Sequence, residues 1–295
     1  GFAGEIVNDS VNSISIKDLN INGNITGNNY TGGIVGTITN NANSQINIEN
    51  IESTFDIDSI GNNVGGLIGL VLNNASGIIN IENAMSTSQI NANNFVGGLI
   101  GQTQNIAKGK ININNLGSNG SVTGNTSIGG AFGSINSYST GQQNVKLVYS
   151  NSNVTASNNE VGGFAGRISS SSTTKVNNIS RSYATGNVEG LTDVGGFVGI
   201  TTYSTYNDTF ATGTYKMFMT GCIGIETVYS QFAKLQSCDF SCFCKLCQVA
   251  VYSTKTDVRK LFLYIHVYKL CTRVIFSAAE KRQNRSSLSA VFHHS

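Results

Sequence analysis

The chain has 295 residues, of which 34 are glycine, none is proline and only 12% are charged, and its formal net charge is +2. No Gly-X-Y triplet period is present, which excludes a collagen triple helix. The hydrophobic residues, 39% of the chain, recur on a fixed pattern. This pattern argues against disorder, because stacked repeats can bury their apolar residues together.

The composition changes once along the chain. Residues 1–214 carry 7 Lys/Arg and 12 Asp/Glu, whereas residues 215–295 carry 11 and 4. All glycines lie at or before Gly224, and all six cysteines lie at or after Cys222. We therefore expect a repeat region over 1–214 and a basic, cysteine-containing tail over 215–295. Because Gly1 lies inside a repeat, we also expect a fragment, and the absence of a targeting signal is uninformative.

A short Gly-Gly motif recurs six times in the first segment, at steps of 32 or 33 residues. Its glycine pairs are Gly32 and Gly33, Gly65 and Gly66, Gly97 and Gly98, Gly129 and Gly130, Gly162 and Gly163, and Gly195 and Gly196. Typical copies read Val-Gly-Gly-Leu-Ile-Gly and Val-Gly-Gly-Phe-Val-Gly. A period this regular indicates a repeat architecture, in which these glycines are structural.

Apolar residues recur at constant offsets from the first glycine of each pair. Offset 14 holds Ile14, Ile46, Ile79, Ile111 and Val176, with Gln143 as the exception; offset 16 holds Ile16, Ile48, Ile81, Ile113 and Val145; offset 25 holds Ile25, Ile57, Ile90, Val122 and Val154, with Val188 one residue later. The Ile-x-Ile spacing has a period of two, and β-branched residues favour strands.

Each unit therefore has three strand candidates: the Gly-Gly stretch, the Ile-x-Ile stretch and the stretch around offset 25. Asn, Ser and Gly separate them, as turns require. Three short strands per unit, stacked in register, predict an all-β parallel β-solenoid (β-helix) with coils of 32–33 residues and a poorly defined C-terminal tail.

The Gly-Gly strand has large apolar residues on both faces if it alternates regularly, so it is expected to be covered on both sides. One interpretation is tight core packing at a corner, where glycine permits close approach of the backbone. The alternative is an outer apolar stripe that docks a partner. The stripe would consist of Phe2, Ile34, Leu67, Leu99, Ala131, Phe164 and Phe197.

Offset 18 carries a short polar series, formed by Asp18, Asn50, Asn83 and Asn115. Stacked asparagines can hydrogen-bond along a solenoid as ladders, as in cross-β stacks. We interpret these residues as structural turns, with no ligand-binding role.

Val194-Gly-Gly-Phe-Val-Gly199, preceded by Arg181-Ser-Tyr-Ala-Thr-Gly-Asn-Val-Glu-Gly190, resembles the GLUG-motif repeat. The resemblance covers residues 1 to about 200. Such repeats occur in large secreted or surface-attached proteins, including adhesin-like proteins and non-catalytic parts of IgA-specific zinc metallopeptidases. The resemblance implies an extracellular or cell-surface location and a binding or spacer role, and it brings no catalytic residues with it.

Beyond Gly199 the repeat decays. Residues 209–215 resemble residues 182–188 but follow them by 27 residues, and 219–224 could be a decayed Gly-Gly motif.

The tail holds Cys238, Cys242, Cys244 and Cys247, which are too crowded to surround one zinc ion easily. A frameshifted tail and a genuine second domain both remain open. Membrane contact is expected only through the tail, where charges interrupt the apolar run over 261–268.

Catalysis is not expected in this chain. All three histidines, His266, His293 and His294, lie in the tail, and no His-Glu-x-x-His motif is present. Asp56 and Asp58 share a strand face near Glu49 and Glu52, but we interpret them as a solvated acidic edge. We expect no catalytic residue, metal or cofactor. Nucleic-acid binding is not expected either, because residues 1–214 lack a basic face.

The sequence thus favours a structural or adhesive repeat module of a secreted or cell-surface protein, with a protein or glycan as partner. The alternative is the non-catalytic spacer of a secreted peptidase. A polysaccharide-acting solenoid enzyme is a third, weaker hypothesis.

Overall fold

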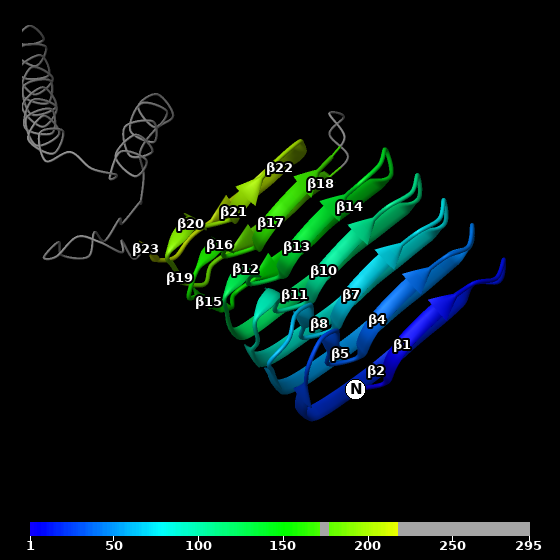
Figure 1. The fold of residues 1–295 in the computed structure, drawn as a ribbon, viewed down its shortest axis with the longest axis horizontal. Helices are drawn as coiled ribbons and strands as arrows, with labels where there is room; N and C mark the ends of the chain where they lie inside the picture. Colours follow the sequence, from blue (N-terminus) through cyan, green and yellow to red (C-terminus); the bar gives the residue numbers. More distant parts are fainter. Residues whose placement is uncertain (172–176, 218–295) are drawn as a thin grey trace, which may run out of the picture. The chain divides into compact units, whose positions relative to one another are not determined.

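The computed structural model describes residues 1–171 and 177–217. These residues contain no helix and form a parallel β-solenoid, which confirms the predicted fold class. The chain passes through three parallel sheets in each coil of about 32 residues, and we call them sheets A, B and C. The successive strands of sheet A can be followed in Figure 1 from β1 to β21.

Sheet A contains one strand from each of seven coils, and sheet C contains one strand from each of the first six. Sheet A consists of β1 (Ala3–Asn8), β4 (Val35–Asn40), β7 (Ile68–Asn73), β10 (Ile100–Asn105), β13 (Phe132–Ser137), β17 (Ala165–Ser170) and β21 (Val198–Thr201). Sheet C consists of β3 (Thr31–Gly32), β6 (Val64–Gly65), β9 (Asn94–Gly97), β12 (Thr126–Gly129), β16 (Asn159–Gly162) and β20 (Thr192–Gly195).

Sheet B contains the longest strands. Its first four coils each supply one long strand: β2 (Ile14–Gly27), β5 (Gln45–Ser59), β8 (Ile78–Asn91) and β11 (Lys110–Gly124). The next three coils each supply two shorter ones: β14 (Gln142–Ser150) and β15 (Asn153–Ala156), β18 (Asn177–Ala184) and β19 (Val188–Gly190), and β22 (Ser204–Ala211) and β23 (Tyr215–Met217).

The register of sheet B follows the predicted apolar offsets. Ile46 stacks between Ile14 and Ile79, and the valines and isoleucines of offset 25 stack in one row from Ile25 to Val188. One prediction was wrong: Asn177, and not Val176, pairs with Gln143. Val176 itself lies outside the described residues. The extra residue before β18 shifts the sixth coil by one position relative to a strict repeat.

The second and third strand candidates were predicted as separate elements, but in the first four coils they form one bent strand. In β5 the buried side chains change phase at the bend, from Ile46 and Ile48 to Ile51 and Ser53. Asn50 takes up the extra position because its φ of 58° is left-handed. Asparagine tolerates this conformation, so the bend needs no loop.

The Gly-Gly stretch was predicted as one strand, and this was also wrong. In the second coil, Val64 and Gly65 belong to β6 of sheet C, the chain then bends, and β7 of sheet A begins at Ile68. A Cβ on Gly65 would lie closer than 3.0 Å to the carbonyl oxygen of Ile68, and the first glycine of every pair has the same environment. The chain therefore turns a corner that only glycine can fill.

The second glycine of each pair allows two sheets to approach each other. A Cβ on Gly66 or Gly98 would lie closer than 3.0 Å to the hydroxyl of Ser86 or Ser118, which face them from sheet B. It would also lie this close to the carbonyl oxygen of the second glycine in the next coil. Small residues on both sides thus keep this corner of the solenoid narrow.

Because the chain turns at the corner, the apolar residues of the motif all point inward. Ile34, Leu67, Leu99, Ala131 and Phe164 are at most 1% exposed. The carbonyl oxygen of Leu67 accepts hydrogen bonds from the N–H groups of both Ile34 and Val35, at 2.8 and 3.1 Å. Tight corner packing is therefore confirmed for these five residues, and Phe197 also packs against the core. The outer apolar stripe was wrong, since of its seven members only Phe2 is exposed, at 53%.

A shortened seventh coil follows the last Gly-Gly motif. Ser182, Tyr183 and Ala184 pair with Thr209, Phe210 and Ala211, so the 27-residue step keeps the register. The shortening falls between β21 and β22, which are joined by only Thr202 and Tyr203. Strand pairing of sheet B continues through Met217.

Candidate functional site

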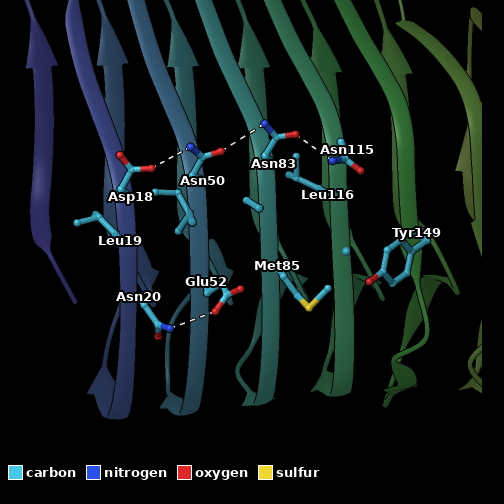
Figure 2. Close-up of a pocket in the computed structure, with 13 residues that line it drawn as sticks. Asp18, Leu19, Asn20, Asn50, Glu52, Asn83, Met85, Asn115, Leu116 and Tyr149 are labelled. Atoms are coloured by element: carbon cyan, nitrogen blue, oxygen red, sulfur yellow. Dashed lines mark hydrogen bonds between the residues drawn. The ribbon is translucent and has the colours of Figure 1, made fainter.

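The bend of sheet B creates a groove on the outside of the solenoid. The residue at the bend has a positive φ in each coil, from Asp18 at 57° to Arg181 at 47°. Along the first five coils this bend forms a groove with a volume of about 440 Å³ (Figure 2). The groove runs across the strands, so each coil contributes a similar set of side chains.

One wall of the groove is the amide ladder, which we define as Asp18, Asn50, Asn83 and Asn115. Figure 2 shows the side chains joined in one line. Asn50 donates to Asp18 at 2.8 Å, Asn83 donates to Asn50 at 3.4 Å, and Asn115 donates to Asn83 at 2.9 Å. The predicted ladder is thus confirmed.

The other wall is the outward row, which we define as the sheet B residues two positions after the bend. Its members are Asn20, Glu52, Met85, Gly117, Tyr149, Tyr183 and Phe210. Unlike the ladder, the row varies from coil to coil. Asn20 donates to the carboxylate of Glu52 at 3.1 Å, and Met85 is 40% exposed.

Tyr149 closes one end of the groove. Its hydroxyl end covers the backbone of Gly117, because a Cβ on Gly117 would lie closer than 3.0 Å to the ring and hydroxyl atoms of Tyr149. Figure 2 shows the Tyr149 hydroxyl pointing toward the groove. The groove therefore ends, on the side of the later coils, at the ring of Tyr149.

Beyond the groove, the outward row becomes an aromatic stack. Tyr149 stacks on Tyr183 at a centroid distance of 5.5 Å, and Tyr183 stacks on Phe210 at 5.1 Å. The two interplanar angles, 12° and 8°, show face-to-face overlap. Phe210 remains 55% exposed. This stack was not predicted from the sequence. The 27-residue step between residues 182–188 and 209–215 already aligned Tyr183 with Phe210 and was a signal for it.

A second outer ladder was also missed. It consists of Asn47, Asn80, Asn112, Asn144 and Asn178, joined by side-chain hydrogen bonds of 2.8–3.0 Å. These residues stand between the two apolar positions of the Ile-x-Ile stretch in most coils. Their constant spacing was a signal that could have predicted the ladder.

The acidic residues lie on the outer face of sheet B, as predicted. Asp56 and Asp58 line a second groove of about 340 Å³, with Gln89 and Asn91. Asp58 accepts a hydrogen bond from Asn91 at 3.0 Å. On the other side of the bend, Glu49 pairs with Lys17 at 3.0 Å. Three of the four predicted acidic residues thus have a hydrogen-bonding partner in the neighbouring coil.

One charged pair lies away from these grooves, at the edge between sheets C and A. Glu160 is buried, and the guanidinium of Arg167 forms two hydrogen bonds with its carboxylate, one of them from Nε at 2.8 Å. Ser127 donates a further hydrogen bond. Burial alone would raise the pKa of Glu160, but the bonds from Arg167 and Ser127 and the charge of Arg167 lower it. The hydrogen bond to Glu160 raises the pKa of Arg167.

The four clustered cysteines and the three histidines of the tail, for which no metal-binding or catalytic role was predicted, lie outside the described residues. Within 1–171 and 177–217, no group of three or more His, Cys, Asp or Glu side chains is arranged to hold a metal ion. The same part of the chain contains no helix that could cross a membrane.

No protein-family model, no curated protein and no solved structure matches this chain.

Proposed function

We propose that the solenoid is a binding module of a larger secreted or cell-surface protein, built from GLUG-type repeats and without catalytic activity. Its partner is a protein or glycan that contacts the outer face of sheet B. The observation that carries this proposal is the contrast between the two sides of that sheet. Most inward positions keep one residue type through the first four coils, such as the isoleucines of offset 14, whereas the outward row already changes there and continues to change from Asn20 to Phe210.

The outward row has the composition of a contact surface. Met85 and Phe210 are exposed on an outer face that also carries polar ladders. Exposed apolar and aromatic side chains are enriched where proteins contact partners. They contribute nothing to stacking in the core, because they point away from it. Such a row on a rigid sheet supports recognition of a partner.

The contacts of the acidic residues favour a binding role for the solenoid over a catalytic one. Glycosidic hydrolysis needs two carboxyl groups with separate roles and perturbed pKa values. Here Glu49 is engaged by Lys17 and Asp58 by Asn91, and both grooves are open to solvent. These contacts make the acids part of the stacking between coils.

The test is binding of the full chain to an array of purified extracellular-matrix proteins and of neutral and anionic oligosaccharides. We expect saturable binding to at least one component. The row variant Met85→Ser/Tyr183→Ser/Phe210→Ser should weaken this binding at least tenfold, which corresponds to about 1.4 kcal/mol. The matched variant Thr54→Ala/Thr87→Ala changes exposed residues of the same sheet outside the row, and it should bind normally.

Three results would reject the proposal. The first is no binding to any component, and the second is equal binding by the row variant and the wild type. The third is release of sugars or peptides from the array by the purified chain, which would establish an enzyme. Circular dichroism of each variant would show whether the fold is kept.

The alternative function is a spacer in a secreted peptidase. It is favoured by the continuous register of the seven coils, which makes the solenoid stiff along its axis. A spacer needs no exposed row, so its binding should be absent or unaffected by the row variant. Chain sequence adjoining this segment and carrying a His-Glu-x-x-His motif would support this alternative.

A further inference from the structure

We propose that the groove along the bend of sheet B binds an extended, neutral glycan whose chain lies parallel to the solenoid axis. This inference rests on the proposed binding function and specifies its partner. The groove adjoins the aromatic stack and ends where the ring of Tyr149, the first member of that stack, covers Gly117.

The first argument is the hydrogen-bonding capacity of the amide ladder. In the described part of the chain, the amide nitrogen of Asn83 donates one hydrogen bond, to Asn50, and its oxygen accepts one, from Asn115. An amide has two N–H donors and two acceptor lone pairs, so each asparagine rung keeps at least one donor and one acceptor, whereas the carboxylate of Asp18 can only accept. A sugar hydroxyl both donates and accepts, and it can use the two together.

The second argument is the spacing of the rungs. Neighbouring parallel strands are about 4.8 Å apart, so the amide groups repeat at this interval along the groove. Successive rings of an extended glycan follow one another at a similar interval. Each ring has hydroxyl groups on both edges, so it offers one to a rung even where the linkage turns alternate rings over. An extended peptide presents equivalent groups only every second residue, about 6.6 Å, and would lose register after one rung. From Asp18 to Asn115 the ladder spans three intervals, about 14 Å, which suits about three sugar rings.

The third argument is the shape and polarity of the opposite wall. Met85 is 40% exposed and offers a flexible apolar surface to the C–H face of a sugar ring. The hydroxyl of Tyr149 stands at the closed end as a further hydrogen-bonding group. A binding site with a few placed polar groups beside an apolar surface is typical of small-molecule recognition.

Charge selects against acidic glycans. The groove contains two carboxylates, Asp18 and Glu52, and its lining contains no basic side chain. The nearby Lys17 is already paired with Glu49 at 3.0 Å. Like charges in a site disfavour binding, so uronic-acid or sulfated chains should bind poorly. The preferred ligand is therefore a straight chain of uncharged hexoses or N-acetylhexosamines.

The experiment is isothermal titration calorimetry of the full chain with cellohexaose, mannohexaose and chitohexaose, and with hexagalacturonate as the acidic comparison. We expect at least one neutral hexasaccharide to bind, and hexagalacturonate to bind at least tenfold more weakly. Met85→Glu should weaken binding of the neutral ligand at least tenfold. Thr87→Glu is the matched control, since Thr87 is exposed on the same strand outside the groove; it should leave the affinity unchanged.

A second variant tests the ladder directly. Asn83→Gly keeps the left-handed backbone, because glycine adopts a positive φ freely, but it removes one rung. It should weaken binding about three- to tenfold. Asn80→Ser, on the same strand but in the ladder outside the groove, should not. Unchanged thermal melting of the binding-deficient variants would separate lost contacts from lost folding.

The proposal is overturned if none of the three neutral hexasaccharides binds, or if Met85→Glu and Thr87→Glu have equal effects. Preferred binding of hexagalacturonate would also overturn it. If matrix proteins bind the outward row while all glycans fail, this inference is rejected and the proposed binding function stands. If neither proteins nor glycans bind, both are rejected.

Discussion

The first four coils and the later coils follow the same backbone path, but different side chains hold them together. Up to Asn115 the bend of sheet B carries an amide ladder, and the inward position of offset 14 is filled by isoleucine. After Asn115 the bend carries Leu147, Arg181 and Asp208, which still have φ values of 47–56°. The later coils place an aromatic stack on the outside.

The interior of the two regions differs as well. Gln143 and Asn177 are fully buried where the earlier coils have isoleucine. Gln143 donates to the carbonyl of Asn136 and accepts from the hydroxyl of Thr103, both at 2.6 Å. Ser137 donates to Asn177 at 2.7 Å. The comparison teaches that the backbone ladders and the glycine corners define the coil, whereas other positions can change type. Gln143 stacks on Ile111 and finds its hydrogen-bonding partners on sheet A.

The largest loss of stability is expected at the glycine corner, which both regions share. Gly98→Val would place side-chain atoms against the carbonyl oxygen of Gly130 and against Ser118, closer than 3.0 Å. Because backbone cannot move aside there, we expect a loss of more than about 4 kcal/mol, or no folding. Urea unfolding measures it. Gly4→Ala is the control, since a Cβ on Gly4 meets nothing within 4 Å, and it should change stability by less than about 0.5 kcal/mol.

Exchanging the inward residue of offset 14 between the two regions would test whether each region depends on the side chain that it has there. Ile79→Gln buries an amide between Ile46 and Ile111, which offer no partner, and should destabilise by about 3 kcal/mol. The reverse change, Gln143→Ile, should cost about 1–2 kcal/mol, because Asn136 and Thr103 lose their partner while apolar burial increases. Equal losses in chemical denaturation would contradict this interpretation.

Loss of the ion pair between Glu160 and Arg167 should lower stability and change how stability depends on pH. Arg167→Met leaves the buried carboxylate of Glu160 with Ser127 alone, and we expect a loss of about 2 kcal/mol at neutral pH. Arg167 is 35% exposed, so the effect is smaller than for a fully buried pair.

The folded state lowers the pKa of Glu160 from its ordinary value of 4.5. The pair therefore stabilises the fold above about pH 4.5, and this stability is lost as the pH falls through the lowered pKa. Denaturation at pH 7 and pH 3 should show a smaller difference for Glu160→Gln than for the wild type. An identical difference would contradict the assignment.

The smallest effect is expected from a substitution that extends the amide ladder into the later coils. Leu147 has a φ of 56° and is 41% exposed, so its side chain gains little from burial and strains the backbone. Leu147→Asn should relieve the strain and continue the ladder from Asn115, stabilising the fold by about 1 kcal/mol. Leu147→Gly relieves the strain alone. Thermal melting in which the glycine variant equals or exceeds the asparagine variant would show that the ladder adds nothing.

The sequence alone determined the period, the sheet B register of the first five coils and the amide ladder. These features are local: a β-strand alternates every two residues, and identical residues in successive coils reveal which positions stack. Ile46, Asn50 and Ile57 could be assigned for this reason. The repeat predicted an outward-facing Asp56 and Asp58 in the same way.

The tertiary structure alone decided where the chain turns and what the turns create. Alternation could not show that Gly65 and Leu67 lie on two sides of a corner, because the corner arises from close approach to the carbonyl of Ile68. The groove was likewise hidden, since it forms between Asn83 at the bend and Met85 two residues later, across several coils. A repeating sequence specifies which residues stack, whereas the angle between sheets depends on backbone contacts that no single repeat contains.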